Sequence, residues 1–172
     1  MRAEKSRPEC TDQLYDYLNS VETGDKSNRE GLAARCYFTA LFGRGFVRHA
    51  PDSTNAALNY GYALILSTVS RALVLHGYST ALGIHHISRV NRFNLSCDLM
   101  EPFRPFVDLQ VYRQGERSFD KLFKRELIAS LQKRVLYGGR HCILEDAVSD
   151  FSLRTCRLMT DCRGELPEVR FD

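Results

Sequence analysis

The longest apolar run of the chain, from about residue 53 to residue 76, constrains the fold most. It is apolar on nearly all sides between Tyr62 and Val69, and Gly77 ends it. A helix that is hydrophobic all round is buried, either in the core of a protein or in a membrane. Because Asn59 and Arg71 interrupt the run, we predict the buried central helix of a helical bundle and no membrane span.

Helical periodicity recurs on both sides of this run. Apolar residues spaced by three and four predict further helices over residues 13–21, 27–43, 95–112, 118–135 and 143–159. Pro102 and Pro105 predict a kink or a late start in the third of these. No segment alternates as a half-buried strand does, so the predicted class is all-α. The bundle is expected in residues 25–160, between a short helical lead (1–24) and a loose tail (161–172).

Local patterns predict how two of these helices begin. Ser27-x-x-Glu30 is the pattern of a capping box, in which Ser27 precedes the helix and Glu30 is its third residue. Ser53 or Thr54 is expected to cap the long helix. Gly61 lacks a side chain and would let a neighbouring helix pack closely against the long one.

The six cysteines are interpreted as reduced thiols of a cytoplasmic protein. The first residues, MRAEKSRPECTD, are charged and lack the apolar run of a signal peptide. No two cysteines form a C-x-x-C pair, which disfavours a zinc ribbon. The net charge of +3 is too small to indicate a nucleic-acid partner by itself.

Candidate chemistry gathers in residues 82–105. His85 and His86 are followed by Asp98 and Glu101, and a histidine and two carboxylates that meet in space can hold a divalent cation. Each acid also has a simpler interpretation, because Asp and Glu three residues apart are typical of a capped helix start. Adjacent histidines point to different sides, so we expect only one of them to bind a metal ion.

Basic residues lie close to these acids in the sequence. Arg89, Arg92 and Arg104 could contact the phosphates of a DNA backbone. A later basic stretch, over residues 121–140, is interpreted as solvent-exposed helix faces.

Three stretches, in this order, resemble the helical domain of the CRISPR-associated integrase family, Cas1, and most of all its type II branch. They are SNREGLAARCYFTALFG, NAALNYGYALIL and LGIHHISRVNRFNLSCDLMEPFRP, and the likeness runs from about Gly24 to Val111. The resemblance implies a metal-dependent DNA endonuclease and integrase of CRISPR adaptation. Such an enzyme inserts new spacers into a CRISPR array by attack of a 3′-hydroxyl on a phosphodiester.

The resemblance also implies the site. The metal ligands would be Glu30, His86 and Glu101, with Asp98 as a supporting residue or a further ligand. His86 is preferred to His85 because the family's ligand ends a G-x-x-H element. Carboxylates with one imidazole suit Mg²⁺ or Mn²⁺ better than Zn²⁺. The implied partners are double-stranded or branched DNA, a Cas2 protein and a second copy of the chain.

The chain departs from the family pattern at its amino-terminal end. Family members carry a β-rich domain there that builds the dimer, whereas only a short helical lead precedes Glu30 here. We therefore expect that domain to be absent. Two alternatives stay open: a non-catalytic DNA-binding or assembly remnant of the integrase, and a small helical protein with a structural zinc site formed by His85, His86 and Cys97.

Overall fold

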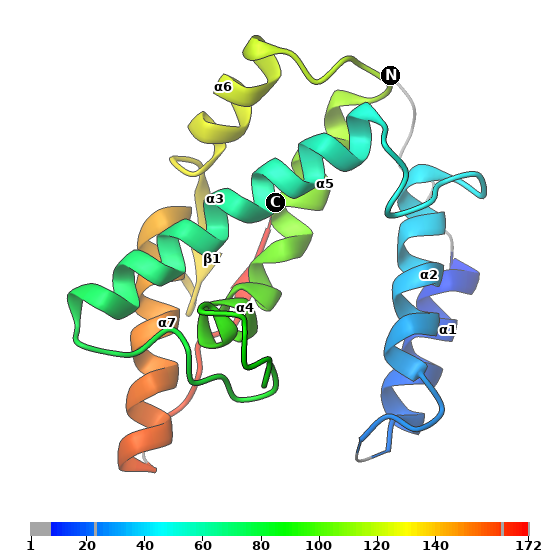
Figure 1. Ribbon diagram of the computed structural model, residues 1–172. Coiled ribbons are helices and arrows are strands. Elements are labelled where there is room, and N and C mark those ends of the chain that lie inside the picture. Colours follow the sequence, from blue (N-terminus) through cyan, green and yellow to red (C-terminus); the bar gives the residue numbers. More distant parts are fainter. Residues whose placement is uncertain (1–7, 23, 163, 172) are drawn as a thin grey trace. The chain divides into compact units, whose positions relative to one another are not determined.

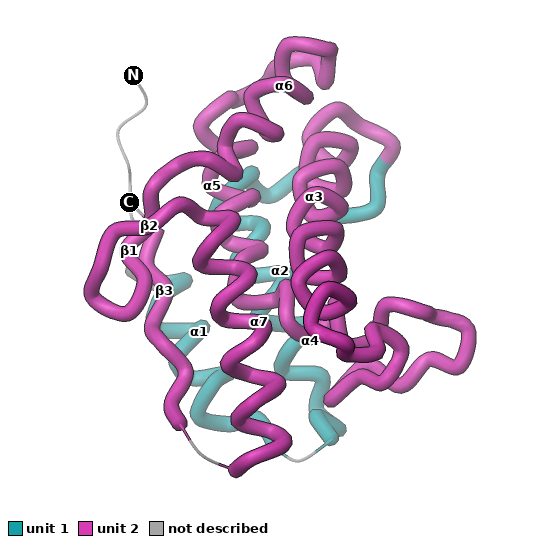
Figure 2. Tube along the Cα trace, turned by 90° about the vertical axis from the view of Figure 1, so that its left-hand side faces the viewer, with its two compact units in different colours: residues 1–50 teal, residues 51–172 magenta. Residues whose placement is uncertain are grey.

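The computed structural model describes residues 8–22, 24–162 and 164–171. It contains two compact units, residues 1–50 and residues 51–172, which Figure 2 shows in different colours. Each unit has its own packing, and the helices and strands carry the labels of Figure 1.

The first unit is a helical hairpin. α1 (Pro8–Ser20) packs against α2 (Arg29–Phe42), and the Cys36 thiol donates a hydrogen bond to Gln13 Oε1 across the pair (3.3 Å). Both predicted helices are present. No residue of α2 is buried, so the hairpin holds its two helices together by half-buried contacts alone.

Asp25, and not Ser27, caps α2. Its carboxylate accepts the backbone N–H groups of Arg29 (2.7 Å) and Glu30 (2.9 Å). The capping-box prediction is wrong because a tight turn, closed by a hydrogen bond from Asn28 N–H to the Asp25 carbonyl (2.9 Å), brings this more distant acid to the helix start. Glu30 is therefore the second residue of α2, and its side chain is exposed.

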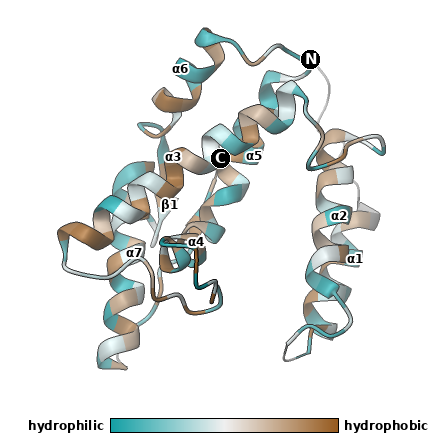
Figure 3. Ribbon diagram, in the orientation of Figure 1, coloured by the Kyte–Doolittle hydropathy of each residue, from teal (hydrophilic) through white to brown (hydrophobic). Residues whose placement is uncertain are grey.

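α3 (Ser53–Leu75) lies at the centre of the second unit. It packs against four other helices: α4 (Asn94–Met100), α5 (Arg104–Gln114), α6 (Lys121–Ser130) and α7 (Leu144–Asp161). Apolar residues recur along α3 (Figure 3), and Leu58, Ile65 and Leu73 have no exposed surface. The predicted buried central helix is thus confirmed. By length and hydropathy α3 could also cross a membrane, but the core helix of a bundle has the same properties.

The start of α3 differs from the prediction by one residue. Asp52, in place of Ser53 or Thr54, accepts the backbone N–H of Asn55 (2.7 Å). The Asn55 side-chain amide donates to the same carboxylate (3.0 Å), so the longer acid satisfies two donors where a hydroxyl would satisfy one.

The predicted helix over residues 95–112 is broken at Pro102. α4 ends just before it, a single 3₁₀ turn covers Glu101–Phe103 (η1), and α5 follows. Pro102 and Pro105 each lie in the first turn of the element that follows, where the missing N–H has no helical partner to lose. The break confirms the predicted kink and puts Glu101 at the junction of two helices.

The segment after α6 differs most from the prediction. Instead of continuing as a helix, the chain forms β1 (Arg134–Tyr137) and β2 (Arg140–Ile143), an antiparallel pair joined by Gly138 and Gly139. Both glycines have positive φ (55° and 78°), which two-residue hairpin turns require. β3 (Val169–Arg170), in the segment predicted as a loose tail, pairs with the other edge of β1. These short strands leave the predicted all-α class in place.

α3 and α5 cross closely at Gly61. A Cβ added to Gly61 would lie only 2.3 Å from Val107 Cγ1, so no larger residue fits unless Val107 shifts. The next residues along the two helices are Tyr62 and Asp108, and the Tyr62 hydroxyl donates a hydrogen bond to the Asp108 carboxylate. The close packing predicted at Gly61 is confirmed.

We predict that Gly61→Ala lowers the free energy of unfolding by about 1–3 kcal/mol, because overpacking a filled core costs that much. Helix propensity alone predicts the opposite sign, a gain of about 1 kcal/mol. Urea denaturation followed by circular dichroism measures the change. Gly45→Ala, where an added Cβ meets no atom within 4 Å, is the control and should change stability by less than about 0.5 kcal/mol. An unchanged Gly61→Ala variant would contradict the close crossing.

Candidate active site

The Asp98 carboxylate organises the turn that carries the two histidines. Its Oδ2 accepts the backbone N–H groups of Ile84 (2.5 Å) and His85 (3.1 Å), and its Oδ1 accepts that of His86 (3.1 Å). Three consecutive backbone donors therefore converge on one side chain, of which only 7% is exposed. A carboxylate so placed fixes the course of the chain from Gly83 to His86.

Asp98 also fixes the ring of His86. His86 Nδ1 lies 2.6 Å from Asp98 Oδ1. Burial raises the pKa of Asp98, but the hydrogen bonds from the His86 ring and from the three backbone N–H groups outweigh it and hold the pKa below its ordinary value. An ionised carboxylate only accepts hydrogen bonds, so Nδ1 carries the proton, and in the neutral form of the ring Nε2 is the acceptor. The His86 side chain is 38% exposed.

Asn94 and Gly83 complete this arrangement. The Asn94 side-chain amide donates to the carbonyls of Ala81 (3.0 Å) and Ser88 (2.7 Å) and so ties both ends of the histidine turn to α4. A Cβ on Gly83 would lie 2.2 Å from the His86 carbonyl oxygen, so only glycine fits. Sequence reasoning missed Asn94, because helical periodicity does not show that this polar side chain is buried (4% exposed).

Glu101 is the first residue of η1. Its Oε1 forms an ion pair with Arg104 Nη2 at 3.0 Å, and its side chain is 45% exposed. The Arg104 guanidinium lies over the ring of Tyr62, 5.0 Å from the centroid. Glu101 therefore pairs with Arg104, three residues after it. Asp98, three residues before Glu101, faces the histidine turn instead.

Glu30 lies in the first unit and His86, Asp98 and Glu101 in the second. Of these four, the structure brings together His86 and Asp98. Among residues 8–22, 24–162 and 164–171, no three His, Cys, Asp or Glu side chains form a group that could hold a metal ion. Two of these residues nevertheless have the chemistry of ligands for a divalent cation. The Nδ1 of His86 is held by a carboxylate, as in metal-binding histidines, and the Glu101 carboxylate is accessible to solvent.

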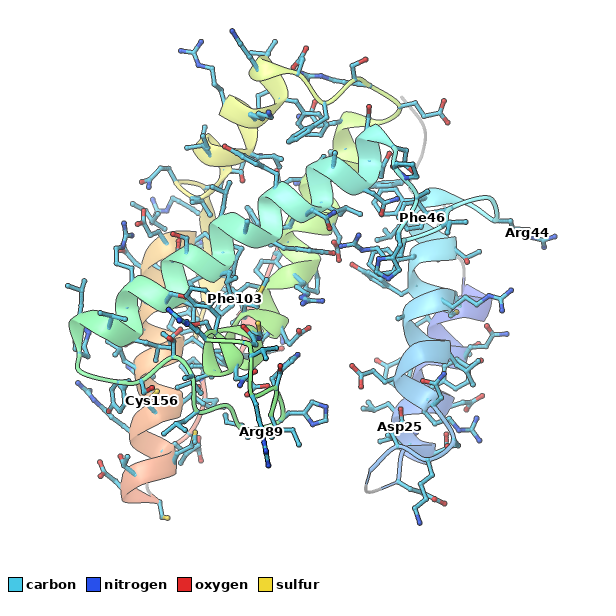
Figure 4. The ribbon with its side chains drawn as sticks, viewed as in Figure 1. Asp25, Arg44, Phe46, Arg89, Phe103 and Cys156 are labelled. Carbon is cyan, nitrogen blue, oxygen red and sulfur yellow. The ribbon has the colours of Figure 1, made fainter. Side chains whose placement is uncertain are left out.

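The remaining candidates lie on the surface or have other partners. The His85 ring contacts that of His86 edge to face, with centroids 5.9 Å apart. Cys97 Sγ accepts a weak hydrogen bond from the Asn91 amide (3.6 Å), so the described residues give no support to a zinc site of His85, His86 and Cys97. Arg89, which points away from the ribbon in Figure 4, and Arg92 are exposed.

Comparison with known proteins gives one consistent family. The family model of CRISPR associated protein Cas1 matches residues 9–126. A CRISPR-associated endonuclease Cas1 of Neisseria meningitidis serogroup C is 42% identical over 134 residues, which cover 75% of this chain and 44% of that protein. A Cas1 endonuclease of Pyrobaculum aerophilum is 40% identical over 111 residues, covering 59% of this chain and 36% of the relative.

A solved structure shows the same fold. A casposase bound to integration product matches with a TM-score of 0.71 and 22% identity, over 91% of this chain and 56% of that one. The chain spans less than half the length of both curated relatives.

We predict that Asp98→Ala loosens the histidine turn. Three backbone donors lose their acceptor, and each hydrogen bond to a charged group contributes about 1.5–3 kcal/mol. Amide hydrogen exchange at Ile84, His85 and His86 should therefore accelerate by about tenfold or more, as read by two-dimensional NMR. Asp161→Ala, which removes an exposed acid at the end of α7, should leave these three amides unchanged. Equal exchange in both variants would show that the turn does not depend on Asp98.

Proposed function

Because the chain belongs to the family of CRISPR-associated protein Cas1, we propose that it is the helical part of a metal-dependent DNA endonuclease and integrase of CRISPR adaptation. The reaction proposed is insertion of new spacers into a CRISPR array by attack of a 3′-hydroxyl on a phosphodiester. The observation that carries the proposal is the His86–Asp98 pair, in which a buried carboxylate holds the ring by Nδ1. The names of the relatives agree, since they are endonucleases, and so does the casposase structure with its integration product.

The ligands proposed for Mg²⁺ or Mn²⁺ are Glu30, His86 and Glu101. His86 would offer Nε2, and the two glutamates would offer carboxylate oxygens. Glu30 is assigned by the resemblance of its stretch alone. Such an ion, when bound, would polarise the phosphodiester and neutralise charge on the leaving oxygen.

Asp98 is proposed to act through His86. Both of its oxygens already accept N–H groups, so its contribution is to keep the ring in one tautomer and one orientation. Gly83 and Asn94 serve the same end, since they let the turn pass close to α4 and tie it there. The chain's own contacts hold this part of the site within the second unit, which lowers the cost of ordering it on binding.

The substrate proposed is double-stranded or branched DNA. Arg89 and Arg92 are exposed on the loop that follows His86, where they could contact backbone phosphates near the reacting bond. Arg104 would contribute a third positive charge beside Glu101. A Cas2 partner, a homodimer and a cytoplasmic location complete the proposal.

The first experiment measures nicking of branched and double-stranded DNA with Mn²⁺ or Mg²⁺. Activity should fall to the level seen without metal in Glu30→Gln, His86→Asn and Glu101→Gln, because each removes a proposed ligand. Glu116→Gln, which alters an exposed acid in the loop after α5, is the control and should retain full activity. Salt-dependent DNA binding without metal-stimulated nicking would favour the non-catalytic DNA-binding or assembly module instead.

The second experiment measures DNA affinity as a function of salt. Each lost phosphate contact lowers the slope of log K against log salt concentration by about 0.9. The double variant Arg89→Gln, Arg92→Gln should therefore lower the slope by about 2. A matched double variant on α7, Arg154→Gln with Arg157→Gln, removes the same charge and should change the slope by much less. Equal slopes for the two double variants would mean that the loop makes no special phosphate contact.

A further inference from the structure

A chain of contacts leads from the core of the second unit to Glu101. The Asp108 carboxylate accepts the hydrogen bond of the Tyr62 hydroxyl. The ring of Tyr62 carries the Arg104 guanidinium on its face, at 5.0 Å, and Arg104 Nη2 pairs with Glu101 Oε1 at 3.0 Å. The function proposed above gives no role to Tyr62 or Asp108. It also gives no role to the stacking of Arg104 on the tyrosine ring.

The inner end of this chain is buried and costs free energy to maintain. Asp108 is 2% exposed and Tyr62 8% exposed. A buried carboxylate is costly unless hydrogen bonds satisfy it, and a leucine would fill a helix crossing at lower cost. Asp108 directly follows Val107, and Tyr62 directly follows Gly61, the two residues of the close α3–α5 contact. Their separation is therefore set by helix packing and cannot easily vary.

Arg104 is held in an unusual way. Its Nε is buried, and no group of the described residues accepts a hydrogen bond from it. An unsatisfied buried donor costs free energy, so the side chain keeps this position because other contacts outweigh the cost. Those contacts are the face of Tyr62, which attracts a cation, and the carboxylate of Glu101. The direction of the guanidinium consequently depends on the ring beneath it.

We infer that Tyr62 and Asp108 are positioning residues that hold Glu101, through Arg104, in the orientation in which it binds a divalent cation. The inference rests on the proposed function, since it takes Glu101 as a metal ligand. Asp108 fixes the hydroxyl end of Tyr62, the ring fixes the plane of Arg104, and Arg104 limits the rotamers of Glu101. Residues that orient a ligand in this way strengthen metal binding without touching the ion.

The test measures Mn²⁺ binding by the 172-residue chain directly, from the loss of the free-ion signal in electron paramagnetic resonance. Arg104→Met should weaken binding by about 10- to 100-fold, the usual effect of losing such a partner. Tyr62→Phe keeps the ring but loses its hydrogen bond, and it should weaken binding in the same direction. Asp108→Leu should do likewise, and Asp108→Asn, which keeps an oxygen acceptor for Tyr62, should recover most of that loss.

Two matched variants separate positioning from a general loss of contacts. Tyr137→Phe removes another tyrosine–aspartate hydrogen bond, to Asp150 (2.8 Å), and Arg154→Met removes another arginine–carboxylate pair, to the same acid (2.6 Å). Both should bind Mn²⁺ as the unaltered chain does. The melting temperature of every variant is measured alongside, so that an unfolded variant is recognised and its conservative counterpart is used.

The outcomes distinguish the inference from the proposal beneath it. If Glu101→Gln abolishes Mn²⁺ binding while folded Tyr62→Phe and Arg104→Met bind as tightly as the unaltered chain, the positioning inference is overturned and the metal site stands. If the unaltered chain and Glu101→Gln bind Mn²⁺ equally, the assignment of Glu101 as a ligand fails and the inference fails with it. Weaker binding in Glu101→Gln and also in the Arg104, Tyr62 and Asp108 variants, with Tyr137→Phe and Arg154→Met unchanged, supports both.

Discussion

The close crossing of α3 and α5 is the contact on which the second unit depends. Gly61 lets the two helices approach until Val107 fills the space of a missing side chain. The crossing buries the central helix against its neighbours and sets Tyr62 beside Asp108. Because α5 follows directly after η1, the same contact decides where Glu101 emerges at the surface. The packing of the core thus also determines where the proposed ligand Glu101 lies. Many functional sites are instead carried by loops that vary independently of the core.

A second constraint acts on the histidine turn. α4 carries both Asn94 and Asp98, which satisfy the carbonyls and N–H groups of a segment without helical or strand hydrogen bonds of its own. Backbone groups left without partners in a packed structure are costly, and these two side chains remove that cost. The turn therefore has a fixed course, although it has no repeating structure, and this course sets the position of His86.

The sequence predicted what depends on local pattern and missed what depends on distant contacts. The buried helix and the kink at Pro102 follow from periodicity and from the missing N–H of proline, and both were confirmed. The capping by Asp25 was missed because a nearer serine, Ser27, fits the capping pattern. The β1–β2 hairpin was missed because helical periodicity extends to residue 135, inside β1, and neither short strand shows the alternation of a half-buried strand. The sequence pattern of Asp98 fits a helix cap. Only its burial and its hydrogen bonds show that its carboxylate supports the histidine turn.

Asp98 binds the histidine turn through main-chain N–H groups. Every amino acid except proline has such a group. The side chains of Ile84 and His85 take no part in it, and both are exposed. These two positions can consequently change between related proteins without disturbing the ring of His86. The side chains next to the proposed reaction centre can thus change while the ring of His86 keeps its position. Because the exposed side chains and the support of the His86 ring are independent, substitutions at Ile84 and His85 would alter the surface that meets a ligand and leave the ring in place.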